Sequence, residues 1–159
     1  MTPTQLAKGG SEHAHQVALF AWANMAASHG FAAANDPVSY ACREYTISNY
    51  GVDARIESLS DMFAIPNGGE RHAAVAANLK AEGVKSGVSD IFLPVPVGIR
   101  HGLFIELKKP ALGKKPAGRL TEAQSAFIVR MLRRGYAATG AIGWEEATRI
   151  IICYYGGTL

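Results

Sequence analysis

Residues 89–108 read SDIFLPVPVGIRHGLFIELK, and the fold follows from this stretch more than from any other. Ile91-Phe92-Leu93 predicts a short strand, which ends at Pro94-Val95-Pro96 because proline cannot donate a hydrogen bond to a sheet ladder. Residues 98–102, with a glycine at each end, predict a hairpin loop. Residues 103–108 then predict a second strand, so we expect a hairpin.

Apolar and polar positions alternate along the second strand. In a strand, successive side chains point to opposite faces, so Glu106 and Lys108 share a face with Phe104. The other face carries Leu103, Ile105 and Leu107. Glu106 and Lys108 should therefore lie side by side.

Helices are predicted before the hairpin. Ser11 is a suitable N-cap for a helix from Glu12 to about Ala27, and Gly30 would end it. The turn Asn67-Gly68-Gly69 precedes an Ala- and Leu-rich segment that predicts a second helix over residues 70–82. Residues 31–60, which include Pro37 and Gly51, are interpreted only as a possible helical insertion.

The chain after the hairpin continues in the same α/β style. Thr121-Glu122-Ala123-Gln124 matches a helix capping box, and the helix should run to Arg134, with Gly135 as its stop. Residues 136–141 can form another strand, and residues 144–155 a final helix or a helix plus a strand. This order of elements predicts a mixed α/β layer fold.

Composition indicates one globular domain spanning residues 1–159. The chain has 159 residues, of which 48% are hydrophobic and 18% charged, so it can bury a core. We find no apolar leader and no run of roughly 20 apolar residues, so we expect no membrane span. Cys42 and Cys153 have no partner at metal-ligand spacing, so a disulfide framework or structural zinc site is not expected, and a reducing cytoplasm is the expected location.

Charge is distributed unevenly along the chain. Residues 1–79 hold four basic and seven acidic side chains, a net charge of −3, whereas residues 80–159 hold twelve basic and six acidic side chains, a net charge of +6. A basic half suits a polyanionic partner such as nucleic acid. A solvated charged surface explains charge alone equally well.

Asp90, Glu106 and Lys108 are the candidate catalytic residues. Hydrolysis of a phosphodiester benefits from a hard cation held by carboxylates, and a hairpin can bring Asp90 and Glu106 together. The Lys108 ammonium could orient the attacking water or offset charge on the phosphate. Spacing alone leaves an alternative open, because Glu/Lys pairs are common on solvated sheet edges.

Several motifs, in order, resemble those of the VRR-NUC family, which belongs to the PD-(D/E)XK nuclease superfamily. The resemblance spans about residues 11–155. The motifs are Ser11-Glu12, Ile65-Pro66-Asn67-Gly68-Gly69, residues 81–90 (AEGVKSGVSD), Ile105-Glu106-Leu107-Lys108, Leu120-Thr121-Glu122-Ala123-Gln124 and Gly135-Tyr136.

The resemblance implies a restriction-endonuclease-like core, with a central mixed β-sheet flanked by helices. It implies Mg²⁺ or Mn²⁺ bound by Asp90 and Glu106, with Lys108 as the catalytic lysine and support from Gln124. It also implies a supporting role for Glu12, which is a further candidate catalytic residue and metal ligand. The family often has proline where this chain has Ser89, which replaces a residue that is not a ligand.

The supporting residues also fit purely structural roles. An acidic residue such as Glu12 in the first turn of a helix is favoured by the helix dipole alone. Gln124 could be only the partner of Thr121 in the capping box, although the two roles are compatible. His13 and His15 would point about 200° apart on a helix, which argues against zinc. No Gly-Lys-Ser/Thr ending marks a P-loop.

The predicted function is that of a metal-dependent DNA endonuclease. The resemblance to stand-alone phage and bacterial members implies a homodimer that acts on branched DNA, with four-way (Holliday) junctions as the expected substrate. The cell would be a bacterium or a phage-infected host. The rival hypotheses are a non-catalytic nucleic-acid-binding module of the same fold and a structural protein. Candidate DNA contacts, which could also be ordinary surface charges, are Arg71, Lys85, Lys109, Lys114, Lys115 and Arg119.

Overall fold

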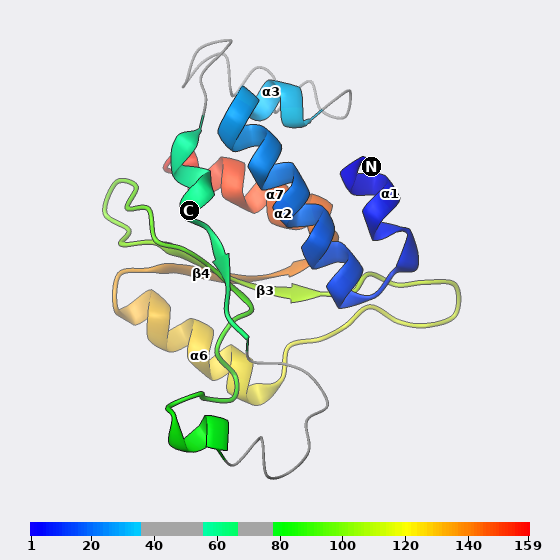
Figure 1. Ribbon diagram of the computed structural model, residues 1–159. Helices are drawn as coiled ribbons and strands as arrows, with labels where there is room; N and C mark the ends of the chain where they lie inside the picture. Colours follow the sequence, from blue (N-terminus) through cyan, green and yellow to red (C-terminus); the bar gives the residue numbers. More distant parts are fainter. Residues whose placement is uncertain (36–55, 67–77) are drawn as a thin grey trace.

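The computed structural model describes residues 1–35, 56–66 and 78–159. Figure 1 shows a sheet with α2 and α7 on one face and α6 on the other. This arrangement confirms the predicted α/β fold, with a central mixed sheet flanked by helices. The named elements are α1 (Pro3–Leu6), η1 (Ala7–Gly9), α2 (Glu12–His29), α3 (Phe31–Ala34), η2 (Glu57–Asp61), β1 (Phe63–Ala64), β2 (Ile91–Leu93), β3 (Leu103–Lys108), α6 (Glu122–Arg133), β4 (Ala137–Ile142) and α7 (Gly143–Tyr155).

The sheet has the order β1-β2-β3-β4. β1 pairs with β2, and β2 with β3, in antiparallel fashion, whereas β3 and β4 are parallel. The predicted hairpin is therefore β2–β3, with Ile91 opposite Ile105 and Leu93 opposite Leu103. The parallel pair requires a crossover, which the chain makes through α6.

The polar face of β3 is covered. β3 lies between β2 and β4, so it is not an edge strand. Glu106 is 0% exposed and Lys108 only 9% exposed. The alternative of a Glu/Lys pair on a solvated sheet edge is therefore wrong, because the crossover helix α6 packs over this face.

The two faces of the sheet pack against separate apolar clusters. Leu103, Ile105 and Leu107 of β3 join the main core, to which α2 contributes Trp22 and α7 contributes Ile151. The smaller cluster lies beneath α6, where Phe127, Ile128, Met131 and Ala138 are buried and Phe104 packs against them. The strand that carries Glu106 and Lys108 is therefore held between two apolar clusters.

The helix ends follow the predicted local chemistry. Ser11 caps α2 by accepting a hydrogen bond from the Ala14 amide at 3.1 Å, and Gly30, with φ of 86°, ends it. The capping box of α6 is present, and the chain leaves the helix at Gly135, with φ of 85°. The final segment is one helix, which removes the helix-plus-strand alternative.

Some predictions lie outside the described residues. The turn at residues 67–69, Arg71, most of the helix predicted over residues 70–82 and most of the possible insertion fall there; residues 78–81 are helical. The short strand β1 was not predicted, since two residues are too few to show a period. Among the described helices, none is long and apolar enough to cross a bilayer.

Candidate active site

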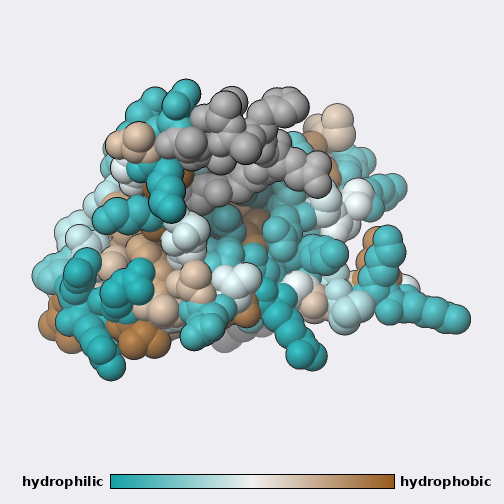
Figure 2. All heavy atoms as spheres, turned by 90° about the horizontal axis from the view of Figure 1, so that it is seen from below, coloured by the Kyte–Doolittle hydropathy of each residue, from teal (hydrophilic) through white to brown (hydrophobic). Residues whose placement is uncertain are grey.

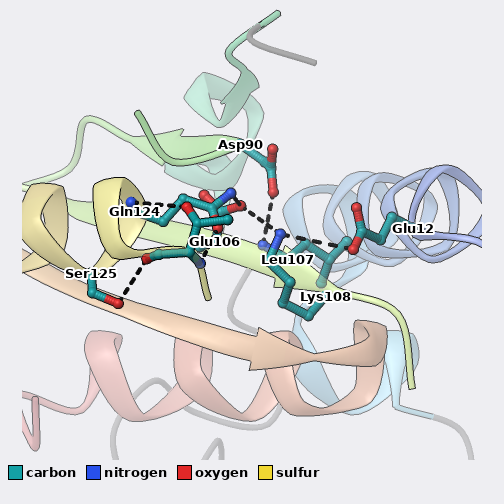
Figure 3. Close-up of polar contacts among 8 residues, drawn as sticks. Glu12, Asp90, Glu106, Leu107, Lys108, Gln124 and Ser125 are labelled. Atoms are coloured by element: carbon teal, nitrogen blue, oxygen red, sulfur yellow. Dashed lines mark hydrogen bonds and ion pairs between the residues drawn. The ribbon is translucent and has the colours of Figure 1, made fainter. Parts of the chain in front are cut away.

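Glu106 is the centre of a buried polar group in the middle of the sheet. Its Oε1 atom accepts hydrogen bonds from Lys108 Nζ, at 2.8 Å, and from Gln124 Nε2 (Figure 3). Its Oε2 atom is also buried but has no hydrogen-bond partner. One oxygen is therefore held by two donors, and the other receives none.

Asp90 is oriented by the backbone of β3. β2 begins at Ile91, which pairs with Ile105 of β3, so the residues of β3 after Ile105 have no paired residue in β2. The Leu107 amide donates instead to Asp90 Oδ2, at 3.0 Å. This bond places the carboxylate of Asp90 beside that of Glu106, as the predicted hairpin geometry requires.

The pKa of Glu106 is raised to about 7. Burial is the largest cause, because it disfavours the charged form, and the neighbouring charge of Asp90 adds to it. The hydrogen bond from Lys108 acts in the opposite direction. Two carboxyl groups in contact in a buried place are electrostatically unfavourable unless a proton or a cation is shared between them.

Lys108 lies between two acidic side chains. Its Nζ atom is 2.8 Å from Glu106 Oε1 and 3.8 Å from Glu12 Oε1 (Figure 3). Burial lowers the pKa of Lys108, but the hydrogen bond and charge of Glu106, with further contributions from Glu12 and Asp90, raise it above its ordinary value. The ammonium group is therefore held as a cation at a fixed position.

Glu12 reaches the site from the first turn of α2, and about half of its side chain is exposed. Gly118 lies over the same spot, since a Cβ atom there would fall 3.2 Å from Lys108 Cδ and 3.3 Å from Glu12 Oε1. Gly118 was not identified from the sequence as a residue of the site. Its contact with the site depends on how the loop after β3 folds back.

Gln124 performs both of the roles considered for it. Its Oε1 atom accepts from the Thr121 amide at 2.9 Å, which completes the capping box, and its Nε2 atom donates to Glu106. A glutamine amide can do both because it carries an acceptor and a donor. The start of α6 is thereby tied to the buried carboxylate.

The structure brings together all five predicted catalytic residues. In the described part of the chain, however, no three His, Cys, Asp or Glu side chains are arranged to hold a metal ion by themselves. Asp90 and Glu106 form a pair, and Glu12 is separated from Glu106 by the Lys108 ammonium. His15 is used otherwise, because its Nδ1 accepts from the Trp144 amide at 3.2 Å.

The candidate DNA contacts that are described are all exposed. The loop between β3 and α6 projects at the right of Figure 1, and Figure 2 shows hydrophilic side chains at the same end. A pocket of about 390 Å³ lies between this loop and the start of α2, with Glu12, Lys109 and Lys115 in its lining. The exposed basic residues are Lys85, Lys109, Lys114, Lys115 and Arg119.

Comparisons with known proteins agree with this architecture. A solved structure described as a "VRR_NUC domain protein" matches with a TM-score of 0.59 at 23% sequence identity, over 92% of this chain and 88% of that chain. No curated protein matches the sequence. The sequence model of the VRR-NUC domain family matches residues 47–142, which is more than half of the chain. The chain therefore belongs to the VRR-NUC family, a nuclease-type family.

Proposed function

We propose that this protein is a metal-dependent endonuclease that hydrolyses DNA phosphodiester bonds at the Asp90–Glu106 pair. The observation that carries the proposal is the buried Glu106 Oε2 atom, which has no hydrogen-bond partner and belongs to a carboxyl group in contact with Asp90. A buried acceptor left without a donor is costly, so a cation or a water molecule bound at this atom would be favourable.

The two carboxylates fit Mg²⁺ or Mn²⁺. These ions take oxygen ligands and are commonly bound by one or two carboxylates, with water and substrate phosphate completing the shell. Such an ion would supply Lewis-acid polarisation of the phosphate and a more acidic water. Glu12 could join through water, but its carboxylate and that of Glu106 both already contact the Lys108 ammonium.

Lys108 supplies fixed positive charge. Its hydrogen bond to Glu106, at 2.8 Å, uses one of the three N–H donors of the ammonium, and the contact with Glu12 is longer, at 3.8 Å. In this position the ammonium can orient a water molecule or stabilise the negative charge that develops on the phosphate during attack. Gln124 keeps the Glu106 carboxylate in place, so its role is positioning.

The substrate follows from the family and from the surface charge. A nuclease-type domain implies nucleic-acid binding, and the exposed basic loop beside the site suits a phosphate backbone. We extend this to branched DNA, with four-way junctions cut by a two-fold homodimer that leaves 5′ phosphates. A non-catalytic binding module is the competing function, and the assembled Asp90, Glu106 and Lys108 group is more than binding requires.

Cleavage of labelled duplex, flap and four-way junction DNA in Mg²⁺ and in Mn²⁺ tests the proposal. Asp90→Ala and Glu106→Ala should abolish cleavage and retain DNA binding, because each removes a metal ligand and no exposed basic residue. Lys108→Ala should also lose cleavage but retain metal binding. Wild-type rates in these variants would refute the assignment. Binding without cleavage by the wild-type protein would support the non-catalytic module.

A further inference from the structure

Phe63 lies on the sheet face that carries the active site. It pairs with Phe92, and Phe92 pairs with Phe104. Directly paired residues share a face, and Phe104 shares its face with Glu106 and Lys108. Phe63, Phe92 and Phe104 therefore form a row across three strands. Asp90 and Glu106 each lie two residues along the chain from a ring of this row, a spacing of roughly 7 Å.

The row ends in an exposed ring. Phe92 and Phe104 are stacked with their centroids 4.2 Å apart, whereas Phe63 meets Phe92 edge-on, at 5.7 Å and 84°. Phe63 is 48% exposed, and the Phe92 contact uses only part of its surface. β1 is also the last strand of the described sheet, so no further described strand covers this side of the ring.

β1 is fixed relative to the catalytic carboxylate. Just beyond the strand, the Ile65 amide donates to the Asp90 carbonyl at 2.7 Å. A molecule in contact with Phe63 would therefore lie at a defined distance from the Asp90–Glu106 pair. The ring ends the aromatic row beside the site and is not an isolated apolar side chain elsewhere on the surface.

The geometry points to Phe63 as a stacking platform for an unpaired nucleobase next to the scissile phosphate. This inference rests on the proposed function and adds to it a preference for DNA with unpaired bases. Bases stack on aromatic rings with little dependence on sequence, but a base within a duplex has both faces covered by its neighbours. Phe63 thus favours single strands, flaps and the open centre of a branch over uninterrupted duplex.

Binding without divalent metal tests Phe63 separately from catalysis. The intact protein in EDTA is titrated with a single-stranded oligonucleotide and with the matching duplex, each containing 2-aminopurine, whose fluorescence falls on stacking. Phe63→Leu keeps apolar contact with Phe92 but loses the stacking surface. We expect about tenfold weaker single-strand binding and less quenching, with duplex affinity within about twofold of wild type.

Phe63→Trp should restore both single-strand affinity and quenching, which guards against a folding defect in Phe63→Leu. Leu132→Ala is the matched control, because Leu132 is 42% exposed near the opposite end of α6 from Gln124 and should change neither quantity. Unchanged single-strand binding and quenching in Phe63→Leu would overturn the inference, as would equal losses on both DNAs.

The outcomes distinguish this inference from the proposed function. If the wild-type protein cuts DNA in Mn²⁺ but Phe63→Leu has wild-type preference for single strands, only the Phe63 inference fails. If no metal supports cleavage but Phe63→Leu binds single strands tenfold more weakly, the stacking platform stands and the catalytic proposal fails. A wild-type protein that binds no DNA overturns both.

Discussion

The side chain of Gln124 bonds both to the cap of α6 and to the Glu106 carboxylate. Variants at Gln124 and Thr121 can therefore distinguish the stability that the cap provides from the positioning of Glu106. Gln124→Ala removes the 2.9 Å bond to the Thr121 amide and one of the two donors to Glu106 Oε1. Loss of the cap costs about 1 kcal/mol of unfolding free energy. A hydrogen bond to a charged group contributes about 1.5–3 kcal/mol, so cleavage should fall roughly 10- to 100-fold.

Thr121→Ala is the matched control for this prediction. It removes the Thr121 hydroxyl, which accepts a hydrogen bond from the backbone N–H of Gln124 at 3.3 Å. It leaves the side-chain amide of Gln124 free to donate to Glu106. It should destabilise the protein by a similar amount, about 1 kcal/mol, and change the cleavage rate by less than about threefold. The two variants therefore share a stability cost and differ in catalysis.

Gln124→Glu adds a second comparison. It keeps an acceptor for the Thr121 amide but replaces the donor with a carboxylate beside Glu106, so its cleavage should fall at least as far as that of Gln124→Ala. Single-turnover cleavage in Mn²⁺ and urea denaturation measure the two effects. Equal cleavage rates in Gln124→Ala and Thr121→Ala, at equal folded fractions, would refute the positioning role.

Three further outcomes are expected. Because the pKa of Glu106 is about 7 in the metal-free protein and a cation must displace its proton, Mn²⁺ affinity should rise about tenfold from pH 6 to pH 8. A flat profile in calorimetric titrations would contradict this. Cleavage should need Mg²⁺ or Mn²⁺, stop in EDTA and be weak in Ca²⁺, whose coordination is longer and looser; activity that survives chelation would exclude the metal mechanism. Light scattering should give a dimeric mass, and four-way junctions should be cut faster than duplex, since two symmetric cuts need two equivalent sites; a monomer without junction preference would refute this.

Local features were predictable because they depend on neighbours in sequence. The Ser11 cap, the Gly30 stop and the capping box of α6 each involve residues within one helical turn, and all three are present. The hairpin of residues 91–108 was also predictable, because consecutive apolar runs joined by a glycine-containing loop commonly pair as antiparallel strands. The family resemblance then identified Asp90, Glu106 and Lys108 as a group.

Local patterns did not place Glu106 in the interior. Alternation along residues 103–108 predicts a polar face, and such a face normally meets water. It is buried here because the parallel strand β4 requires a crossover, and α6 is that crossover. Burial and the contact with Asp90 then raise the pKa of Glu106, which no local pattern could reveal.

The amino-acid sequence was enough to identify which side chains the candidate site contains and the local elements that carry most of them. How these side chains meet became clear only from the folded chain: Lys108 between Glu106 and Glu12, Gln124 bound at once to its cap and to the carboxylate, Gly118 against Lys108, and Phe63 at the end of an aromatic row. These contacts join α2, β1, β2, β3, α6 and the loop that precedes α6. Their geometry depends on sheet order and helix packing, which are set by burial of the whole core and not by any single segment.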